Sequence, residues 1–394
     1  MTPVPVQIFF SEDGDEMIDD LSGLWLGRVW LPEAGGPAVV TLRGGEVIDI
    51  TAKGAATVSD ICEMDDPAAF VRAAPGRALG DHAEIGSAAV GDLSVTHFLA
   101  PCDLQAIKAC GVTFARSMVE RVIEEKAGGD PARAAQIRTR IGRVIGDSLR
   151  NLQAGSDQAM RVKQALIAEG MWSQYLEVGI GPDAEVFSKA QVLSSVGTGA
   201  EIGLHPVSTW NNPEPEIVLA VSSSGRIVGA TLGNDVNLRD VEGRSALLLS
   251  KAKDNNASSA IGPMIRLFDA GYALDDIRRA ELALKVEGED GFVLNGHSSM
   301  SQISRDPQEL VRQTVGRHHQ YPDGFMLYLG TLFAPTEDRD VKGEGFTHKI
   351  GDVVTISAPG LGALRNTVRL STQCAPWTYG VSALMRNLAG RGLI

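Results

Sequence analysis

The first hundred residues carry short runs of alternating apolar and polar positions, the pattern of strands that bury one face. Ala38–Ile50 holds two such runs on either side of Gly44-Gly45, which predicts a β-hairpin. The stretch Pro67–Gly91 is rich in Ala, Gly and Pro and suits a connection. We therefore expect a small β-rich N-terminal domain at residues 1–95 and a larger domain at residues 96–394.

Apolar residues recur at helical spacing in the next part of the chain. Phe114–Lys126 and Pro131–Leu152 each present an apolar stripe, and the glycine pair between them ends the first helix. A third helix is expected from about Ser156 to Gly170. Together these segments predict a helical insertion at about residues 115–172.

Beyond Val178 the pattern returns to short apolar runs separated by glycines. Four strands are expected, at Ile217–Val221, Ile227–Leu232, Gly324–Phe333 and Asp352–Ser357. Strand-rich and helix-rich segments follow one another and do not alternate regularly, which indicates an α+β fold with a mixed or antiparallel sheet.

Composition excludes several classes of partner. The 394 residues carry 49 acidic and 36 basic side chains, a net charge of -13, which disfavours binding to nucleic acid because both surfaces are negative. No apolar run has the length of a membrane span, and the acidic N-terminus lacks the features of a secretory signal. Four unevenly spaced cysteines fit a reducing compartment. We expect a cytoplasmic protein with no nucleic-acid or membrane partner.

The segment Asn212-Pro-Glu-Pro-Glu216 leads into an apolar strand. In a strand, residues i and i+2 face the same side, so Glu214 and Glu216 would lie side by side. Two carboxylates this close repel each other and need a proton or a cation such as Mg²⁺ or Ca²⁺ between them. The alternative is a proline-rich loop whose glutamates point into water.

Asp235 is a candidate for a third oxygen ligand. It follows the run Ile227–Leu232, which would pair with Ile217–Val221 across the turn Ser222–Gly225. The alternative for Asp235 is an ordinary Asn-Asp turn. Lys253 lies in the next polar segment, where a lysine beside a metal site can move a proton or stabilise a developing negative charge. The alternative for Lys253 is a surface lysine.

Taken in chain order, these segments resemble the fumarylacetoacetate hydrolase family. The resemblance covers about residues 100 to 370. Its pieces are Phe187-Ser-Lys189, Ser194-Ser-Val-Gly197, Glu214-Pro-Glu216, Leu232-Gly-Asn-Asp235, Arg239-Asp240, Lys253 with Gly262-Pro263, Gly330-Thr331, Lys349-Ile-Gly-Asp-Val-Val354 and Leu361-Gly-Ala-Leu-Arg-Asn-Thr-Val368.

The resemblance implies a mixed β-roll catalytic domain with a smaller N-terminal domain, assembled into a homodimer or homotetramer. It implies that Glu214, Glu216 and Asp235 hold a divalent metal, Mg²⁺ or alternatively Mn²⁺, which chelates a 2-oxo acid. It further implies that Lys253 is the active-site lysine and that Thr331 contacts the carboxylate of the substrate.

The chain departs from those hydrolases and decarboxylases of the family that carry a Gly-x-Asn-Tyr-x-x-His-x-x-Glu segment. Thr113, Phe114 and Ser117 replace the Asn, Tyr and His, whereas Glu120 keeps the Glu. Loss of the histidine removes the pair that activates water in the hydrolases. Together with the helical insertion, this pattern is similar to the sugar-acid dehydratase branch.

This resemblance implies a hydro-lyase of oxidative pentose degradation. It would dehydrate 2-keto-3-deoxy-D-arabinonate (the same compound as 2-keto-3-deoxy-D-xylonate) to 2-oxoglutarate semialdehyde. Lys253 would be the base or stabilise the enolate, and Glu185, or else Glu120, would protonate the departing C4 hydroxyl. The alternatives are an acylpyruvate or fumarylpyruvate hydrolase, an oxaloacetate decarboxylase and a non-catalytic protein of the same fold.

Four further residues are candidates for substrate contact. Phe114, Ser117 and Arg239 belong to the segments that carry the resemblance or depart from it. Ser299 belongs to the hydroxyl-rich run Gly296–Ser301. That run either binds the hydroxyls of the sugar acid or forms a loop that caps a helix beginning near Pro307.

Overall fold

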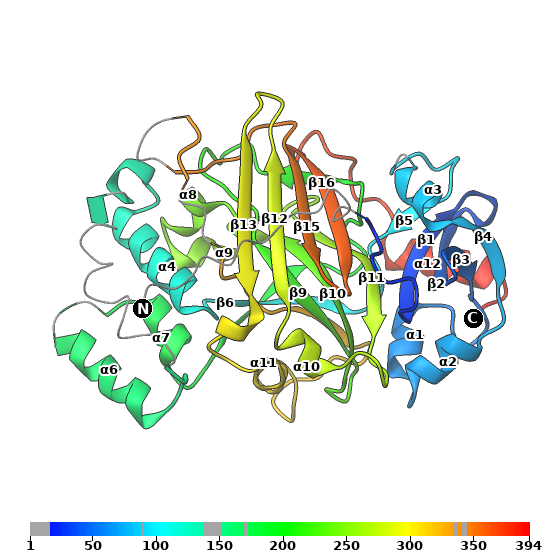
Figure 1. Ribbon diagram of the computed structural model, residues 1–394, viewed down its shortest axis with the longest axis horizontal. Helices are drawn as coiled ribbons and strands as arrows, with labels where there is room; N and C mark the ends of the chain where they lie inside the picture. Colours follow the sequence, from blue (N-terminus) through cyan, green and yellow to red (C-terminus); the bar gives the residue numbers. More distant parts are fainter. Residues whose placement is uncertain are drawn as a thin grey trace.

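Two β-sheets form the centre of the molecule, and helices lie around them (Figure 1). The computed structural model describes residues 16–394 except 89, 135, 138–151, 169, 171, 334–336 and 341–344. The larger sheet has the order β4 (Arg77–Asp81), β3 (Glu46–Asp49), β2 (Gly36–Arg43), β1 (Trp25–Leu31), β11 (Ser259–Leu267), β10 (Ile227–Asp235), β9 (Pro215–Val221), β14 (Phe325–Tyr328), β6 (Ala106–Gly111) and β7 (Glu185–Ala190), with β5 (His97–Leu99) paired to β1. The smaller sheet has the order β13 (Val293–Ser299), β12 (Glu281–Glu287), β15 (Val353–Ala358), β16 (Gly362–Leu370) and β8 (Glu201–Leu204).

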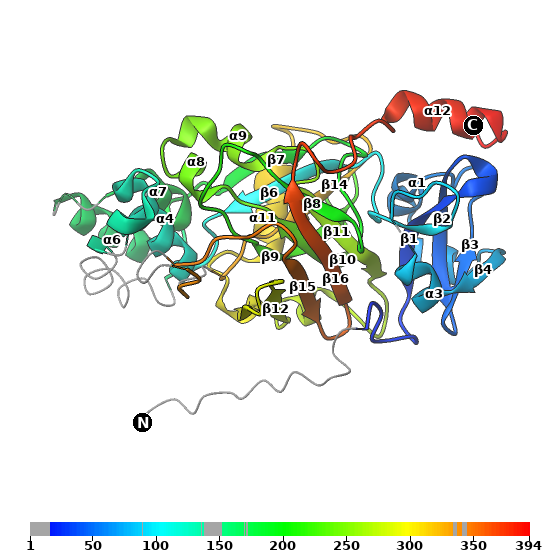
Figure 2. The same ribbon diagram turned by 90° about the horizontal axis from the view of Figure 1, so that it is seen from above.

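The helices gather at the two ends of the sheets (Figure 2). Beside strands β1–β5 lie α1 (Val58–Glu63), α2 (Pro67–Ala73), α3 (His82–Ser87) and α12 (Val381–Gly390). At the opposite end lie α4 (Ala115–Ala127), α6 (Asp157–Ala168) and α7 (Gln174–Ile180). The remaining α-helices among the described residues are short: α8 (Arg239–Glu242), α9 (Leu249–Lys253), α10 (Leu274–Ile277) and α11 (Pro307–Thr314).

Strand β9 lies in the middle of the larger sheet and is buried along its whole length. Its alternating residues enter two different hydrophobic cores: Ile217, Leu219 and Val221 pack with residues of the smaller sheet, whereas Val218 and Ala220 pack toward α1. A strand covered on both faces needs a continuous apolar run, which is what its sequence provides.

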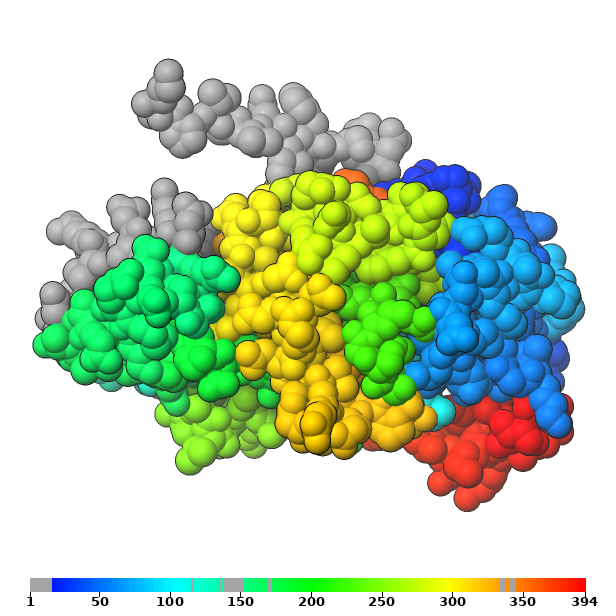
Figure 3. All heavy atoms as spheres, turned by 90° about the horizontal axis from the view of Figure 1, so that it is seen from below, coloured from blue at the N-terminus to red at the C-terminus, as the bar shows by residue number. Residues whose placement is uncertain are grey.

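The N-terminal strands continue the larger sheet, because β1 pairs with β11 through Trp25↔Arg266 and Leu26↔Ile265. The C-terminal helix α12 lies against this same part of the molecule, as Figure 3 shows for the red and blue segments. The Asn387 side chain donates to the Ala34 carbonyl at 2.8 Å, and the Arg391 guanidinium donates to the Pro37 carbonyl at 2.7 Å. Residues from the two ends of the chain therefore share one region of the fold.

Most elements expected from the sequence pattern are confirmed. The hairpin is formed by β2 and β3, and Gly44 and Gly45 at its turn both have positive φ. The four expected strands correspond to β9, β10, β14 and β15, and the expected first and third helices to α4 and α6. The predicted helix Pro131–Leu152 lies largely outside the described residues. The run Gly296–Ser301 is not a loop but the end of β13 and a 3-10 turn, and the side chain that caps α11 is Asp306.

Candidate metal centre and active site

Three carboxylates meet where β9 and β10 run side by side. The register places Glu216 opposite Gly233 and Pro215 opposite Asn234, and the Asp235 amide donates to the Glu214 carbonyl at 3.0 Å. Glu214 and Glu216 lie two residues apart and Asp235 lies on the neighbouring strand, so one carboxylate oxygen of each falls within 4.8 Å of the others. All three side chains are buried.

Lys253, the last residue of α9, lies against this carboxylate trio (Glu214, Glu216 and Asp235). Its Nζ donates to Glu214 Oε2 at 2.6 Å and to Asp235 Oδ2 at 3.0 Å. Burial alone would lower the pKa of Lys253, but the carboxylates of Asp235 and Glu214 raise it above the usual value. Lys189 of β7 is an ion-pair partner of the other Asp235 oxygen at 2.8 Å. The trio is thus held by two buried ammonium groups.

Arg121 joins the trio to helix α4. Its guanidinium forms ion pairs with Glu214, with Glu124 Oε2 at 2.8 Å and with Glu242 Oε2 at 3.0 Å. One planar guanidinium carries five N–H donors and can therefore bridge three carboxylates. Glu242 itself has a raised pKa, because burial outweighs the attraction of Arg121.

Glu185, at the start of β7, also faces the cavity around the trio. It lies over Gly111, where an added Cβ would meet the Glu185 carboxylate oxygen at 2.1 Å. Burial and, to a smaller extent, the negative charge of Glu242 raise the pKa of Glu185 to about 7. A carboxyl group with this pKa is partly protonated at neutral pH and can donate a proton.

The cavity around the trio has an excess of negative charge. Five carboxylates line it, from Glu185, Glu214, Glu216, Asp235 and Glu242, against the two cations of Arg121 and Lys253. Burial raises the pKa of Glu216 well above its usual value, and its neighbours Asp235 and Glu214 raise it further. Clustered oxygen ligands with uncompensated charge fit a hard divalent cation such as Mg²⁺ or Mn²⁺.

Gly330 shapes the mouth of the same cavity. Its amide donates to Glu216 Oε2 at 2.6 Å, and its φ of +87° favours glycine. An added Cβ would meet the Thr113 hydroxyl at 2.1 Å. This tight turn presents the next residue, Thr331, to the cavity.

A second lobe adjoins the first. Ser117, Arg121, Glu214 and Thr331 line both cavities, so the two lie next to each other. The residues that line only the second lobe are Glu120, Glu124, Asn212, Arg239 and Phe333. No histidine is found among the described residues that line either lobe.

The structure brings together most, but not all, of the residues expected at the site. Glu185, Lys253 and the trio line the first lobe, Glu120 and Arg239 the second, and Ser117 and Thr331 both. Phe114 lies in the hydrophobic core at the start of α4 and lines neither lobe. Ser299 also lines neither lobe, and its hydroxyl donates to Glu281 at 2.5 Å.

Sequence reasoning missed the side chains that hold the acids in place. Arg121, Glu124, Glu242 and Lys189 take part in the ion pairs of the trio and its surroundings. Lys189 belongs to the segment Phe187-Ser-Lys189, to which no role was assigned, and Glu242 follows Asp240 by two residues. Both therefore lie in or next to segments that the sequence already singles out. Arg121 is 93 residues away from Glu214 and carries no local signal.

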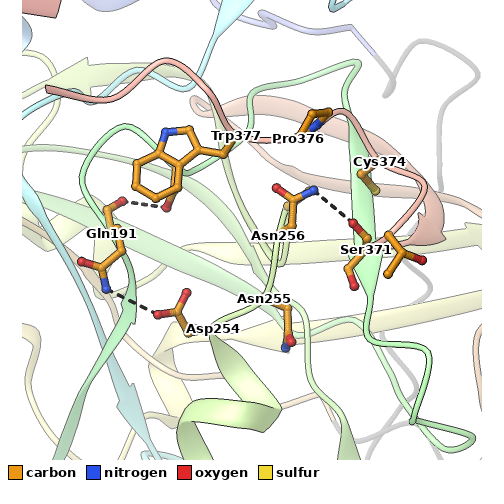
Figure 4. A pocket seen from close by; sticks show the side chains of 11 residues that line it. Gln191, Asp254, Asn255, Asn256, Ser371, Cys374, Pro376 and Trp377 are labelled. Atoms are coloured by element: carbon orange, nitrogen blue, oxygen red, sulfur yellow. Dashed lines mark hydrogen bonds between the residues drawn. The ribbon is translucent and has the colours of Figure 1, made fainter. Parts of the chain in front are cut away.

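A larger cavity of about 550 Å³ lies beside the loop that follows Lys253 (Figure 4). Asn256 points into this cavity, and its amide donates to the carbonyls of Ser371 and Ala375 at 3.1 Å each. Asp254 is the one charged residue among those that line it. The cavity therefore lacks the clustered carboxylates of a metal site.

In this mixed two-sheet fold, three buried carboxylates beside a lysine form a group of oxygen ligands that could hold a metal ion. A family model described as "Fumarylacetoacetate (FAA) hydrolase C-terminal" matches residues 181–369, the segment that holds the trio and Lys253, and this segment is similar to the fumarylacetoacetate hydrolase family. Among the described residues, no helix is both long and apolar enough to cross a membrane.

Two curated relatives are similar in sequence. The chain is 31% identical over 198 residues to a "Probable 2-keto-3-deoxyxylonate dehydratase" of Haloferax volcanii. The matched segment covers 50% of this chain and 64% of the relative. It is also 31% identical over 188 residues to a "2-dehydro-3-deoxy-D-arabinonate dehydratase" of Saccharolobus solfataricus. This matched segment covers 47% of this chain and 58% of the relative. The match thus spans less than two thirds of either relative.

Solved structures are similar in fold. A 2-keto-3-deoxy-D-arabinonate dehydratase in its apo form has a TM-score of 0.62 at 19% identity, covering 88% of this chain and 98% of the other. The same protein complexed with magnesium and 2,5-dioxopentanoate has a TM-score of 0.61 at 20% identity, with the same coverage. At these identities the likeness shows the fold alone.

Proposed function

We propose that this protein is a Mg²⁺-dependent dehydratase of 2-keto-3-deoxy-D-arabinonate that forms 2-oxoglutarate semialdehyde (2,5-dioxopentanoate). One observation carries the proposal: a half-buried carboxyl group with a pKa of about 7, Glu185, faces the same cavity as the carboxylate trio and Lys253. This is what the loss of a hydroxyl group requires, because a hydroxyl leaves readily only when it is protonated. The names of the two curated relatives support the same substrate.

The trio would hold the divalent ion, Mg²⁺ or alternatively Mn²⁺. When bound, such an ion polarises the 2-oxo group of the substrate and makes the C3 protons more acidic. Thr331, which the Gly330 turn presents to the cavity, would receive the carboxylate of the substrate. Ser117 and Arg239 would contact the rest of the substrate. In the same proposal, the fold is a β-roll catalytic domain with a smaller domain at residues 1–95.

The protein's own side chains would move the protons. Lys253 would act at C2 and C3, as the base that takes the C3 proton or as the cation that stabilises the charge left on the 2-oxo oxygen. Glu185 would protonate the C4 hydroxyl, which leaves as water. The net change is the loss of one C3 proton and the C4 hydroxyl.

The alternatives in this family differ in the group that they must activate. A C–C hydrolase needs a water-activating pair, and Ser117 stands where that pair would have its histidine. An oxaloacetate decarboxylase needs no acid for a leaving hydroxyl, so the acid at Glu185 would have no task.

The test is an assay of purified protein with 2-keto-3-deoxy-D-arabinonate and Mg²⁺, coupled to a dehydrogenase that oxidises 2-oxoglutarate semialdehyde with NAD(P)⁺. We expect a signal that EDTA abolishes and added Mg²⁺ restores. No turnover by protein that binds Mg²⁺ in calorimetry would refute the proposal. Acylpyruvates and oxaloacetate would then be the next substrates to test.

A further inference from the structure

The second lobe contains the carboxylate of Glu120, which has no role in the proposed loss of water. Glu120 projects from α4 into this lobe and is buried, with about 10% of its side chain exposed. Glu185 and Lys253 line only the first lobe. A substrate whose C4 hydroxyl lies at Glu185 has one carbon left, C5, to place in the second lobe.

Arg239 lies beside Glu120 and fixes the position of its carboxylate. Its Nη2 lies 3.7 Å from Glu120, while Nη2 and Nε bind Glu124 at 2.6 and 2.7 Å. The guanidinium also lies over the ring of Trp210 at 4.2 Å from its centroid. The ion pair with Arg239 fixes the Glu120 carboxylate at the wall of the second lobe.

The chemistry of the proposed reaction asks for a group at this place. Loss of the C3 proton and the C4 hydroxyl gives 5-hydroxy-2-oxopent-3-enoate, which has the same atoms as the semialdehyde but not the same bonds. To become the aldehyde, a proton must leave C5, the hydroxyl proton at C5 must leave its oxygen, and C3 and C4 must each gain one proton. This is an isomerisation that needs no oxidant, but it needs a base at C5.

We propose that Glu120 is this base, and that the second lobe exists to complete the semialdehyde before release. The proposal rests on the proposed function, because C5 reaches the lobe only if Glu185 serves C4. The carboxylate of Glu120 takes the C5 proton as the C4–C5 double bond forms, and the electrons move through C3=C4 to the 2-oxo group. Protonation at C3 and C4 and loss of the hydroxyl proton then give the aldehyde.

The variant Glu120→Gln tests the role, with Glu125→Gln as its matched control. Glu125 lies on the same helix, but its carboxylate accepts a hydrogen bond from Gln174 and lines neither lobe. By NMR we expect Glu120→Gln to consume the substrate yet accumulate 5-hydroxy-2-oxopent-3-enoate, with semialdehyde formed roughly 100-fold more slowly. Glu125→Gln should release semialdehyde as the wild type does.

Semialdehyde formation by Glu120→Gln at the wild-type rate would overturn the role. If that variant does not fold, Glu120→Asp keeps the charge and should accumulate the enone to a lesser extent. Equal product ratios for Glu120→Asp and the wild type would also overturn it. Wild-type protein and a substrate with deuterium at C5 give an independent measurement: semialdehyde release should slow while substrate consumption does not. If the wild type consumes no substrate at all, the proposed function has failed first.

Discussion

At the scale of single residues, proton affinity decides what Glu185 can do. Burial and the charge of Glu242 raise its pKa to about 7, so the group is protonated below neutral pH and ionised above it. An acid catalyst works only in its protonated form. We expect kcat to be constant below about pH 6 and to fall about tenfold per pH unit above about pH 8.

The measurement is kcat against pH for the wild type and for Glu185→Gln. The variant should lose roughly 100-fold in kcat at pH 6, and its profile should no longer fall through pH 7. A variant that keeps both the wild-type rate and the wild-type profile would remove Glu185 from the acid role.

The substitution Glu216→Gln should maintain or raise the melting temperature in the absence of metal, but it should remove the stabilisation by Mg²⁺. Burial of its carboxylate, and then repulsion from Asp235 and Glu214, raise its pKa well above the usual value. Glu216→Gln removes one negative charge while the Gly330 amide can still donate to the remaining oxygen. In EDTA we expect the variant to melt at the same temperature as the wild type or higher.

Added Mg²⁺ should separate the two proteins in the same melting experiment. An ion that binds only the folded state stabilises it by about 2.7 kcal/mol at 100 times its Kd. The wild type should therefore melt at increasing temperature as Mg²⁺ is added, and Glu216→Gln should not. The exposed replacement Glu84→Gln is the control and should respond as the wild type does.

At the scale of elements, Arg121 connects helix α4 to the carboxylate trio. Lysine is a point charge and cannot bridge Glu124, Glu214 and Glu242 at once. Because buried carboxylates would lose their partner, we expect Arg121→Lys to lower the free energy of unfolding by about 3 kcal/mol. Urea denaturation measures this, and hydrogen exchange should quicken in α4 before β9. The exposed Arg133→Lys serves as control, and equal stability of both variants would contradict the assigned bridge.

The sequence pattern predicts elements whose side chains meet neighbours close in the chain. The pairing of β9 with β10 follows from two apolar runs and a short turn, and it brings Asp235 opposite Glu214. The sequence pattern does not predict β13, because its hydroxyl-bearing residues break the apolar alternation. In the structure the Ser299 hydroxyl instead donates a hydrogen bond to Glu281 on the paired strand β12. It also fails for Arg121, whose partners are fixed by tertiary packing and not by spacing.

At the scale of the whole molecule, the C-terminal helix should stabilise the N-terminal strands. Leu384 and Leu388 of α12 are buried with Ala56, and Asn387 and Arg391 bond the backbone before and within β2. Removing residues 380–394 exposes this contact, so we expect a loss of about 3 kcal/mol from the two leucines. Limited proteolysis should then cleave first within residues 25–100. Met385→Ser, at an exposed position on the same helix, is the control.

The β1–β11 pairing and the docking of α12 have a consequence for synthesis on the ribosome. The strand that completes the edge of β1 ends at Leu267, and the helix that covers β2 ends at Gly390. Segments that emerge first cannot make these contacts until the last have left the exit tunnel. Strands β1 and β2, which can pair with each other early, must therefore wait for β11 and α12 during most of translation, and holding chaperones have their longest opportunity to bind there.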